Sequence, residues 1–179
     1  DGRAWRRLRT TDTGESLGEV DALNVDHSGN VWIATQSNGL YRFDGIEWRN
    51  FVSSPPGQSC GTSSLPSQQT LNASSVRAMR EDHRGDLWFA PLGGGLNRYE
   101  RHGAWSSNGG FRRDGIVSVP DSISVLFEDR RGTLWGGSQF GLAAIDSSRL
   151  SSRIYTREEG LPSDTVLAIT EDSAGTLWV

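Results

Sequence analysis

Paired carboxylates recur along this 179-residue chain, and they are the first residues whose type and spacing could support catalysis. They stand at Glu81-Asp82, Glu128-Asp129 and Glu171-Asp172, and a single Asp26 occupies the corresponding place upstream. A glycosidase needs two carboxyl groups that face one sugar, roughly 5–9.5 Å apart. Because these carboxylates recur at one position of a repeated segment, we expect them to form turns, and the sequence predicts no catalytic residue.

The histidines and the single cysteine do not form a recognisable metal or nucleophile site. His27 and His83 occupy one turn position in two repeats, where Arg130 and Ser173 stand in the other two. Such variation is typical of a solvated turn, and equivalent positions on adjacent repeats are poorly placed for close tetrahedral ligation of zinc. Cys60 has no basic or histidine neighbour in sequence that would favour its thiolate. We therefore expect neither a metal nor a cofactor.

The composition favours strands and excludes some classes of partner. The chain has 22 glycines and 7 tryptophans, and a net charge of −4. Many glycines and aromatic residues favour strands and turns, and the acidic balance gives no basic surface for nucleic acid. No apolar stretch approaches the roughly 18 residues that a membrane helix needs. We expect any signal peptide or membrane anchor to lie outside a chain that opens without Met.

Four segments of the sequence, residues 20–32, 76–88, 123–135 and 166–178, align without gaps. Each has an Asp, a Gly three residues later and a Trp three residues after the Gly. These residues are Asp26, Gly29, Trp32, Asp82, Gly85, Trp88, Asp129, Gly132, Trp135, Asp172, Gly175 and Trp178. The repeats recur at intervals of about 40 to 60 residues, close to the size of one four-stranded propeller blade.

The order of elements within a repeat follows from its residue types. An apolar strand precedes the Asp-x-x-Gly segment. This segment suits a tight turn, because the Asp side chain accepts hydrogen bonds from backbone amides of the turn and Gly adopts a positive φ at little energetic cost. The Trp then lies on a second strand, a second Gly turn leads to a third strand, and a weaker fourth strand follows. We expect the indole to fill the gap between two successive sheets.

The repeat predicts an all-β fold of four-stranded antiparallel β-propeller blades, forming an incomplete propeller. We expect the last strand of a preceding blade at residues 1–10, and complete blades at 20–52, 76–114 and 122–157. The first two strands of a further, truncated blade are expected at 166–179. Residues 53–75, rich in Ser, Pro and Gln, are expected to be a loop insert.

The repeated motifs resemble the two-component regulator propeller repeat. The resemblance is carried by Glu-Asp-x-x-Gly-x-Leu-Trp at Glu81, Glu128 and Glu171, by Gly-Leu-x-Arg-Tyr/Phe at residues 39–43 and 95–99, and by Gly-Leu-Pro-Ser-Asp at 160–164. The third copy departs from the family at Ala143-Ala144. The resemblance implies a seven-bladed propeller in the periplasmic sensor region of a membrane-anchored bacterial signalling protein. Some members of the family sense oligosaccharides.

Ligands usually bind propellers at loops that rigid sheets hold in place. The loops after the second strands carry Gln36, Asn38, Gln139 and Phe140, whose amides and aromatic ring suit a neutral polar ligand such as a sugar. We predict ligand binding there, and ordinary surface turns are the alternative explanation of these residues.

The sequence thus predicts a ligand-binding sensor segment of a periplasmic or extracellular receptor, with no enzymatic activity of its own. An oligosaccharide or another small polar molecule is the expected ligand. Further blades of the same chain, or other copies, are the expected neighbours, and a membrane would be reached only through segments outside the chain. A structural or protein-interaction propeller and a carbohydrate-active propeller enzyme remain the alternatives.

Overall fold

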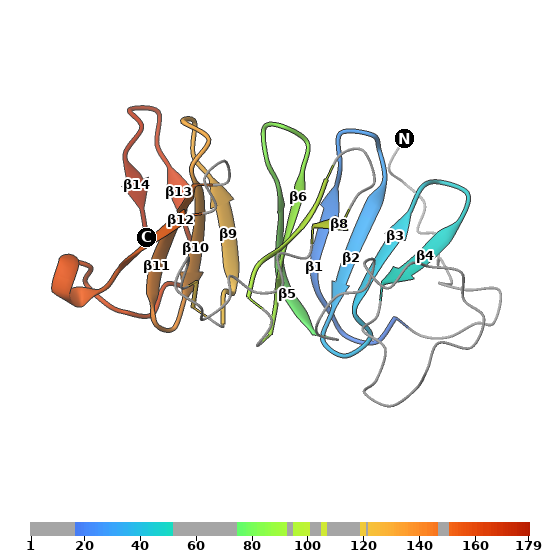
Figure 1. The fold of residues 1–179 in the computed structure, drawn as a ribbon, viewed down its shortest axis with the longest axis horizontal. Coiled ribbons are helices and arrows are strands. Elements are labelled where there is room, and N and C mark those ends of the chain that lie inside the picture. Colours follow the sequence, from blue (N-terminus) through green and yellow to red (C-terminus); the bar gives the residue numbers. More distant parts are fainter. Residues whose placement is uncertain are drawn as a thin grey trace, which may run out of the picture.

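The structure, a computed structural model, describes residues 17–51, 75–92, 95–100, 105–106, 119–120, 122–146 and 151–179. The strand expected at residues 1–10 and, apart from Ser75, the loop insert expected at 53–75 lie outside the described residues. Three four-stranded sheets and one two-stranded sheet follow one another along the chain (Figure 1). Within each sheet, every strand pairs antiparallel with the next, so the predicted all-β fold class is confirmed.

The strands are short, as is typical of propeller blades. The first sheet contains β1 (Val20–Val25), β2 (Val31–Thr35), β3 (Leu40–Phe43) and β4 (Trp48–Phe51). The second contains β5 (Val76–Glu81), β6 (Leu87–Pro91), β7 (Asn97–Tyr99) and β8 (Trp105–Ser106). The third contains β9 (Val125–Glu128), β10 (Leu134–Ser138), β11 (Gly141–Asp146) and β12 (Ser151–Tyr155). A 3-10 turn, η1 (Arg157–Glu159), leads to β13 (Thr170–Glu171) and β14 (Leu177–Trp178).

The Asp-x-x-Gly turn joins the first two strands of every sheet, and Asp129 shows its geometry. The carboxylate oxygen Oδ1 of Asp129 accepts the backbone N–H groups of Arg131 and Thr133, at 2.9 and 2.8 Å. Gly132 closes the turn with a φ of 80°, a conformation that glycine adopts without a Cβ clash. The other oxygen, Oδ2, accepts the indole N–H of Trp135 at 2.8 Å. One side chain therefore fixes both the turn and the tryptophan that follows it.

Three of the four repeated tryptophans lie between successive sheets, as the sequence predicts. Trp32 on β2 is fully buried, and its ring centroid lies 5.5 Å from that of Phe89 and 5.1 Å from that of Tyr99, both in the second sheet. Trp88 is 2% exposed and belongs to a cluster that includes Leu126 and Ile145 of the third sheet. Close packing of a large aromatic side chain at each seam holds the sheets together.

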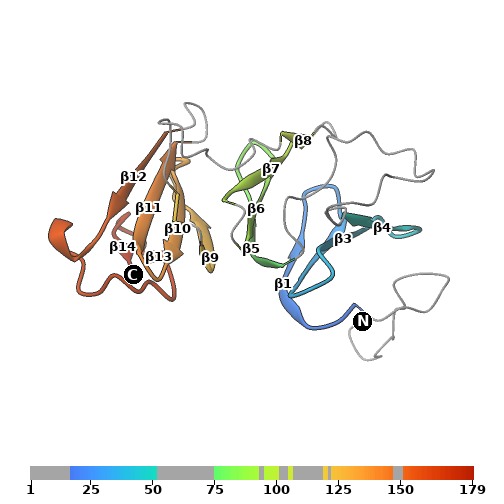
Figure 2. The ribbon, with the colours of Figure 1, turned by 60° about the horizontal axis from the view of Figure 1, so that its bottom comes forward.

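The first three sheets stand side by side in chain order, with their first strands closest together (Figure 2). β1 contacts β5, and β5 contacts β9. We call the side of the sheets formed by these three strands the inner wall. The segment that leads into β13 packs on the third sheet through Val166 and Ile169, which cluster with the partly buried Trp135. The tryptophan of the fourth sheet, Trp178, is 60% exposed because no described segment covers that face. The inner wall is where a site shared by several sheets can form.

Candidate ligand-binding site

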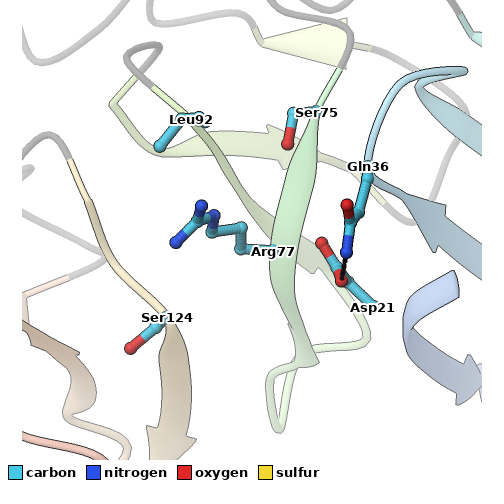
Figure 3. Close-up of a pocket in the computed structure, with 6 residues that line it drawn as sticks. All are labelled: Asp21, Gln36, Ser75, Arg77, Leu92 and Ser124. Carbon is cyan, nitrogen blue, oxygen red and sulfur yellow. Dashed lines mark hydrogen bonds between the residues drawn. The ribbon is translucent and has the colours of Figure 1, made fainter. Parts of the chain in front are cut away.

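A cavity of about 520 Å³ opens at one end of the inner wall (Figure 3). The residues that line it come from three sheets: Asp21, Gln36, Ser75, Arg77, Leu92 and Ser124. They lie where the first strand of each sheet begins and the second strand ends. The lining offers a carboxylate, a guanidinium, an amide and two hydroxyls, with one apolar side chain. The volume is within the range of small-molecule sites, and the lining is more polar than is usual for them.

Two irregularities in the first strands turn charged side chains towards the cavity. The pairing of β1 with β2 passes from Val20 to Ala22 with a register shift, so Asp21 has no partner in β2. The same shift between Val76 and Ala78 leaves Arg77 without a partner in β6. A β-bulge redirects side chains and is common beside functional sites. The bulges therefore place one charge from each of two neighbouring sheets on the inner wall.

The loop after β2 is tied to the start of β1. The backbone N–H of Gln36 donates to the carbonyl of Glu19, and its side-chain Nε2 donates to Oδ1 of Asp21, both at 3.1 Å. In the second sheet, the backbone N–H of Leu92 donates to the carbonyl of Ser75 at 2.9 Å. The cavity wall is thus held by hydrogen bonds between the two strand ends of each sheet.

The two charges of the cavity lie apart. In Figure 3 the guanidinium of Arg77 extends from β5 towards the side of Leu92 and Ser124, whereas Asp21 and Gln36 face each other on the other side of β5. Within the described part of the chain, Arg77 forms no ion pair, and its side chain is exposed. A guanidinium without a carboxylate partner can bind an anionic or strongly polar ligand group.

Of the four ligand-binding residues predicted from sequence, the cavity includes only Gln36. Asn38 instead supports its own loop: its backbone N–H donates to Oγ1 of Thr35, and its Nδ2 donates to the carbonyl of Leu17. Gln139 and Phe140 are exposed on the turn between β10 and β11, and neither lines the cavity. The structure does not bring the four residues together.

Sequence reasoning did not find Asp21, Arg77 and Ser124, although the repeat contains a signal for them. Each is the second residue of its repeat, preceded by Val or Ile and followed by Ala or Val. The corresponding residue of the fourth repeat is Leu167, which is 82% exposed. A position that differs in charge and polarity among otherwise similar repeats is not needed for packing.

The recurring glutamates have a role that the sequence did not predict, because they join neighbouring sheets. The backbone N–H of His83 donates to Oε2 of Glu128 at 2.8 Å, and the His83 Nδ1 lies 2.6 Å from Oε1. The N–H of Arg130 likewise donates to Oε2 of Glu171, at 2.9 Å. His27 and Glu81 repeat the contact between the first two sheets. The carboxylates are therefore engaged at the seams, away from the cavity.

The turn aspartates are stabilised as anions. Burial by itself would raise the pKa of Asp129, but the hydrogen bond from Trp135 and those from the turn outweigh it and lower that pKa. Asp26 shows the same balance with Trp32 and Asn30, and its pKa is also lowered. For Asp172, the bond from Trp178 is the largest cause of a lowered pKa. Such carboxylates are poor proton donors, which suits a structural role.

No group of three or more His, Cys, Asp or Glu in the described ranges could hold a metal ion. The same ranges contain no helix long and apolar enough to cross a membrane.

Comparison with known proteins identifies the repeat. Residues 160–179 match the family described as the two-component regulator propeller, whereas no curated protein matches the chain in sequence. Among solved structures, 96% of this chain aligns with 22% of the extracellular domain of the hybrid two-component system BT3049 from B. thetaiotaomicron, with a TM-score of 0.70 and 21% identity. For the extracellular domain of BT4673 from the same organism, the shares are 95% and 23%, with a TM-score of 0.67 and 22% identity.

The same fold also occurs in an enzyme. A catalytically inactive virginiamycin B lyase from Staphylococcus aureus, in complex with quinupristin, aligns over 89% of this chain and 47% of its own, with a TM-score of 0.60 and 17% identity. This chain spans less than a quarter of the two B. thetaiotaomicron domains, and likeness at these identities shows the fold alone. The chain therefore carries a repeat of the two-component regulator propeller family, and its sheets are blades of an incomplete β-propeller.

Proposed function

We propose that this chain is the ligand-binding part of an extracytoplasmic sensor and that the ligand occupies the cavity at the end of the inner wall. The observation that carries the proposal is the convergence of polar side chains from three successive sheets on one cavity, including Arg77, Asp21 and Ser124. A ligand held there would contact several blades at once. Its binding could therefore change how the blades sit against one another, which is a means of passing a signal.

The chemistry of the cavity supports binding of a polyhydroxylated molecule such as an oligosaccharide. Its lining contains two hydroxyls, an amide and two oppositely charged groups, which together can donate and accept hydrogen bonds. Binding is favoured over catalysis because the recurring acidic residues bond turns and seams, whereas the cavity holds the single carboxylate of Asp21 among the described residues. The family resemblance and the extracellular domains with this fold support a periplasmic or extracellular location.

The structure offers a matched pair of variants for testing this site. Gln36 and Gln139 have the same side chain at the same position of two repeats, but only Gln36 lines the cavity. Oligosaccharides that perturb the amide NMR spectrum of the chain are selected from a panel, and their affinities are measured for both alanine variants. We expect Gln36→Ala to weaken binding, by about fivefold for one lost neutral hydrogen bond, and Gln139→Ala to leave it unchanged. Equal loss in both variants, or loss only in Gln139→Ala, would reject the cavity.

A second role is favoured by the exposed face of the fourth sheet. We propose that the face carrying Trp178 packs against another sheet of the same type. The support is that Trp32 and Trp88, at the same position of their repeats, are covered by the sheet that follows. This proposal concerns assembly of the propeller and is independent of the cavity.

A further inference from the structure

One position of the repeat, which we call the variable position, combines chemical diversity with a constant place in the structure. It is occupied by Asp21, Arg77, Ser124 and Leu167 in the four repeats, and all four are exposed. The residue before it is Val or Ile in every repeat, and in the last three repeats this residue is at most 4% exposed. The flanking residues thus hold the strand against the preceding sheet while the variable position faces the inner side.

Three variable-position residues line the cavity, each from a different sheet. Because the backbone around them is repeated, a change of side chain at this position alters the cavity lining without altering the packing of the blades. In such a fold, single substitutions at the variable position can change ligand specificity, as substitutions on the common binding surface do in other repeat proteins.

The charges of the cavity indicate what this particular combination selects. Oδ1 of Asp21 already accepts the amide of Gln36, on one side of β5 (Figure 3). On the other side, Arg77 extends towards the third sheet, where the variable position is the hydroxyl-bearing Ser124, and no described carboxylate lies within ion-pairing distance of Arg77. A guanidinium can bond both oxygens of a carboxylate or sulfate at once, and a hydroxyl can donate a further bond.

We propose that the variable position determines ligand selectivity, one residue per sheet, and that Arg77 with Ser124 binds an anionic group of a hydroxyl-bearing ligand. The group is a carboxylate or a sulfate ester, such as those of an acidic sugar. This inference rests on the proposed function of the cavity and adds the chemical class of the ligand. The pair formed by Asp21 and Gln36 would then bind the neutral hydroxyl groups of the same ligand.

The test compares three probes that share one ring: D-glucuronate, D-glucose 6-sulfate and D-glucose. Binding to the 179-residue chain is followed by amide NMR at low salt, for the unchanged chain, Arg77→Gln and Arg84→Gln. Arg84 is the matched control because it lies exposed in the turn at the opposite end of the second sheet. We expect at least one acidic probe to bind at least about tenfold more tightly than glucose, and Arg77→Gln to remove that preference, since hydrogen bonds to charged groups are the stronger ones. Arg84→Gln should retain it, and added salt should weaken it.

The outcomes separate this inference from the function on which it rests. Preference for glucuronate alone or for the sulfate alone distinguishes the two anionic groups, and either supports the proposal. If glucose binds as tightly as both acids and Gln36→Ala weakens all three, the cavity binds ligands but the anion proposal is overturned. If an acidic preference persists in Arg77→Gln, Arg77 is not the recognition residue and the proposal is again overturned. If no probe shifts the resonances of cavity residues, the anion proposal fails. Whether the cavity binds any ligand is then decided by the oligosaccharide panel measured on the unchanged chain and Gln36→Ala.

Discussion

At the scale of single residues, the turn aspartate organises each blade. One carboxylate oxygen accepts hydrogen bonds from backbone N–H groups of the turn, and the other accepts a hydrogen bond from the indole N–H of the tryptophan six residues later. In Trp88 this indole is almost fully buried, where an unsatisfied N–H group would be costly. The constant spacing of Asp, Gly and Trp in the sequence is the consequence of this three-part arrangement.

The first prediction concerns pH and Asp129. The folded state holds the pKa of Asp129 below its ordinary value of 3.8. The stabilisation is therefore complete above that value and is lost as pH falls through it towards the folded pKa. Urea unfolding followed by tryptophan fluorescence should show stability falling between about pH 5 and pH 3, where Asp and Glu carboxylates titrate.

Asp129→Asn isolates this contribution. It should lower the free energy of unfolding at neutral pH by about 1 to 3 kcal/mol, because the indole and turn amides lose a charged acceptor. It should also weaken the pH dependence of stability. A pH dependence that is equally steep in Asp129→Asn and the unchanged chain would contradict the assignment.

At the scale of the elements, each sheet is stabilised by its neighbours more than by itself. The apolar clusters of the described residues lie at the seams between sheets, and each contains side chains of both sheets that meet there. At each seam, a glutamate of one sheet also accepts a hydrogen bond from the Asp-x-x-Gly turn of the preceding sheet. A tryptophan therefore contributes to stability only where a following sheet covers it.

Trp88 and Trp178 test this dependence, since they share a repeat position but are 2% and 60% exposed. Trp88→Ala should destabilise the chain by about 3 to 5 kcal/mol, or abolish its cooperative unfolding, because a large cavity replaces the indole. Trp178→Ala should change the free energy of unfolding by less than about 1 kcal/mol, as for most exposed substitutions. Urea denaturation of both variants measures the difference, and equal effects would show that the seams do not dominate stability.

At the scale of the whole molecule, the first and fourth sheets each have a face that no described sheet covers, and these two faces correspond to the two sides of one seam. The fourth sheet presents Trp178 and the turn of Ser173, which correspond to the donor side of each internal seam. The first sheet presents Leu23 and Val25, both more than 60% exposed, at the acceptor side. Val25 stands where the other three repeats have the glutamate that accepts the turn N–H. A second copy therefore lacks the carboxylate that the fourth sheet is arranged to meet.

Introducing a carboxylate at position 25 should promote head-to-tail association between copies of the chain. Val25→Glu should strengthen self-association by about tenfold relative to the neutral Val25→Gln, since a charge-assisted hydrogen bond forms at the new seam. Adding Trp178→Ala should reverse the gain, because the same seam loses its central aromatic side chain. Sedimentation velocity over a range of concentrations measures the effect. Identical behaviour of Val25→Glu and Val25→Gln would show that this face does not recognise the glutamate.

The repeat pattern was sufficient to predict the fold class, because Asp, Gly and Trp act locally within one turn and its following strand. It also predicted that Trp32 and Trp88 lie between sheets, since apolar strand faces must be covered. Even the weak fourth-strand signals near Trp105 and Tyr155 correspond to strands, β8 and β12. Each of these properties depends on residues within one repeat or between two adjacent ones, so the sequence determined them.

The candidate site was decided by the tertiary structure. Gln36, Asn38, Gln139 and Phe140 were chosen for their loop positions, yet only Gln36 lines the cavity. Arg77 and Ser124 line the same cavity because a bulge in β5 and the contact of β5 with β9 place them on one inner wall. The spacing of residues along the chain cannot show this, since the cavity depends on how three separate sheets are inclined to one another. Local hydrogen bonding thus fixed the blade, and packing between blades fixed the site.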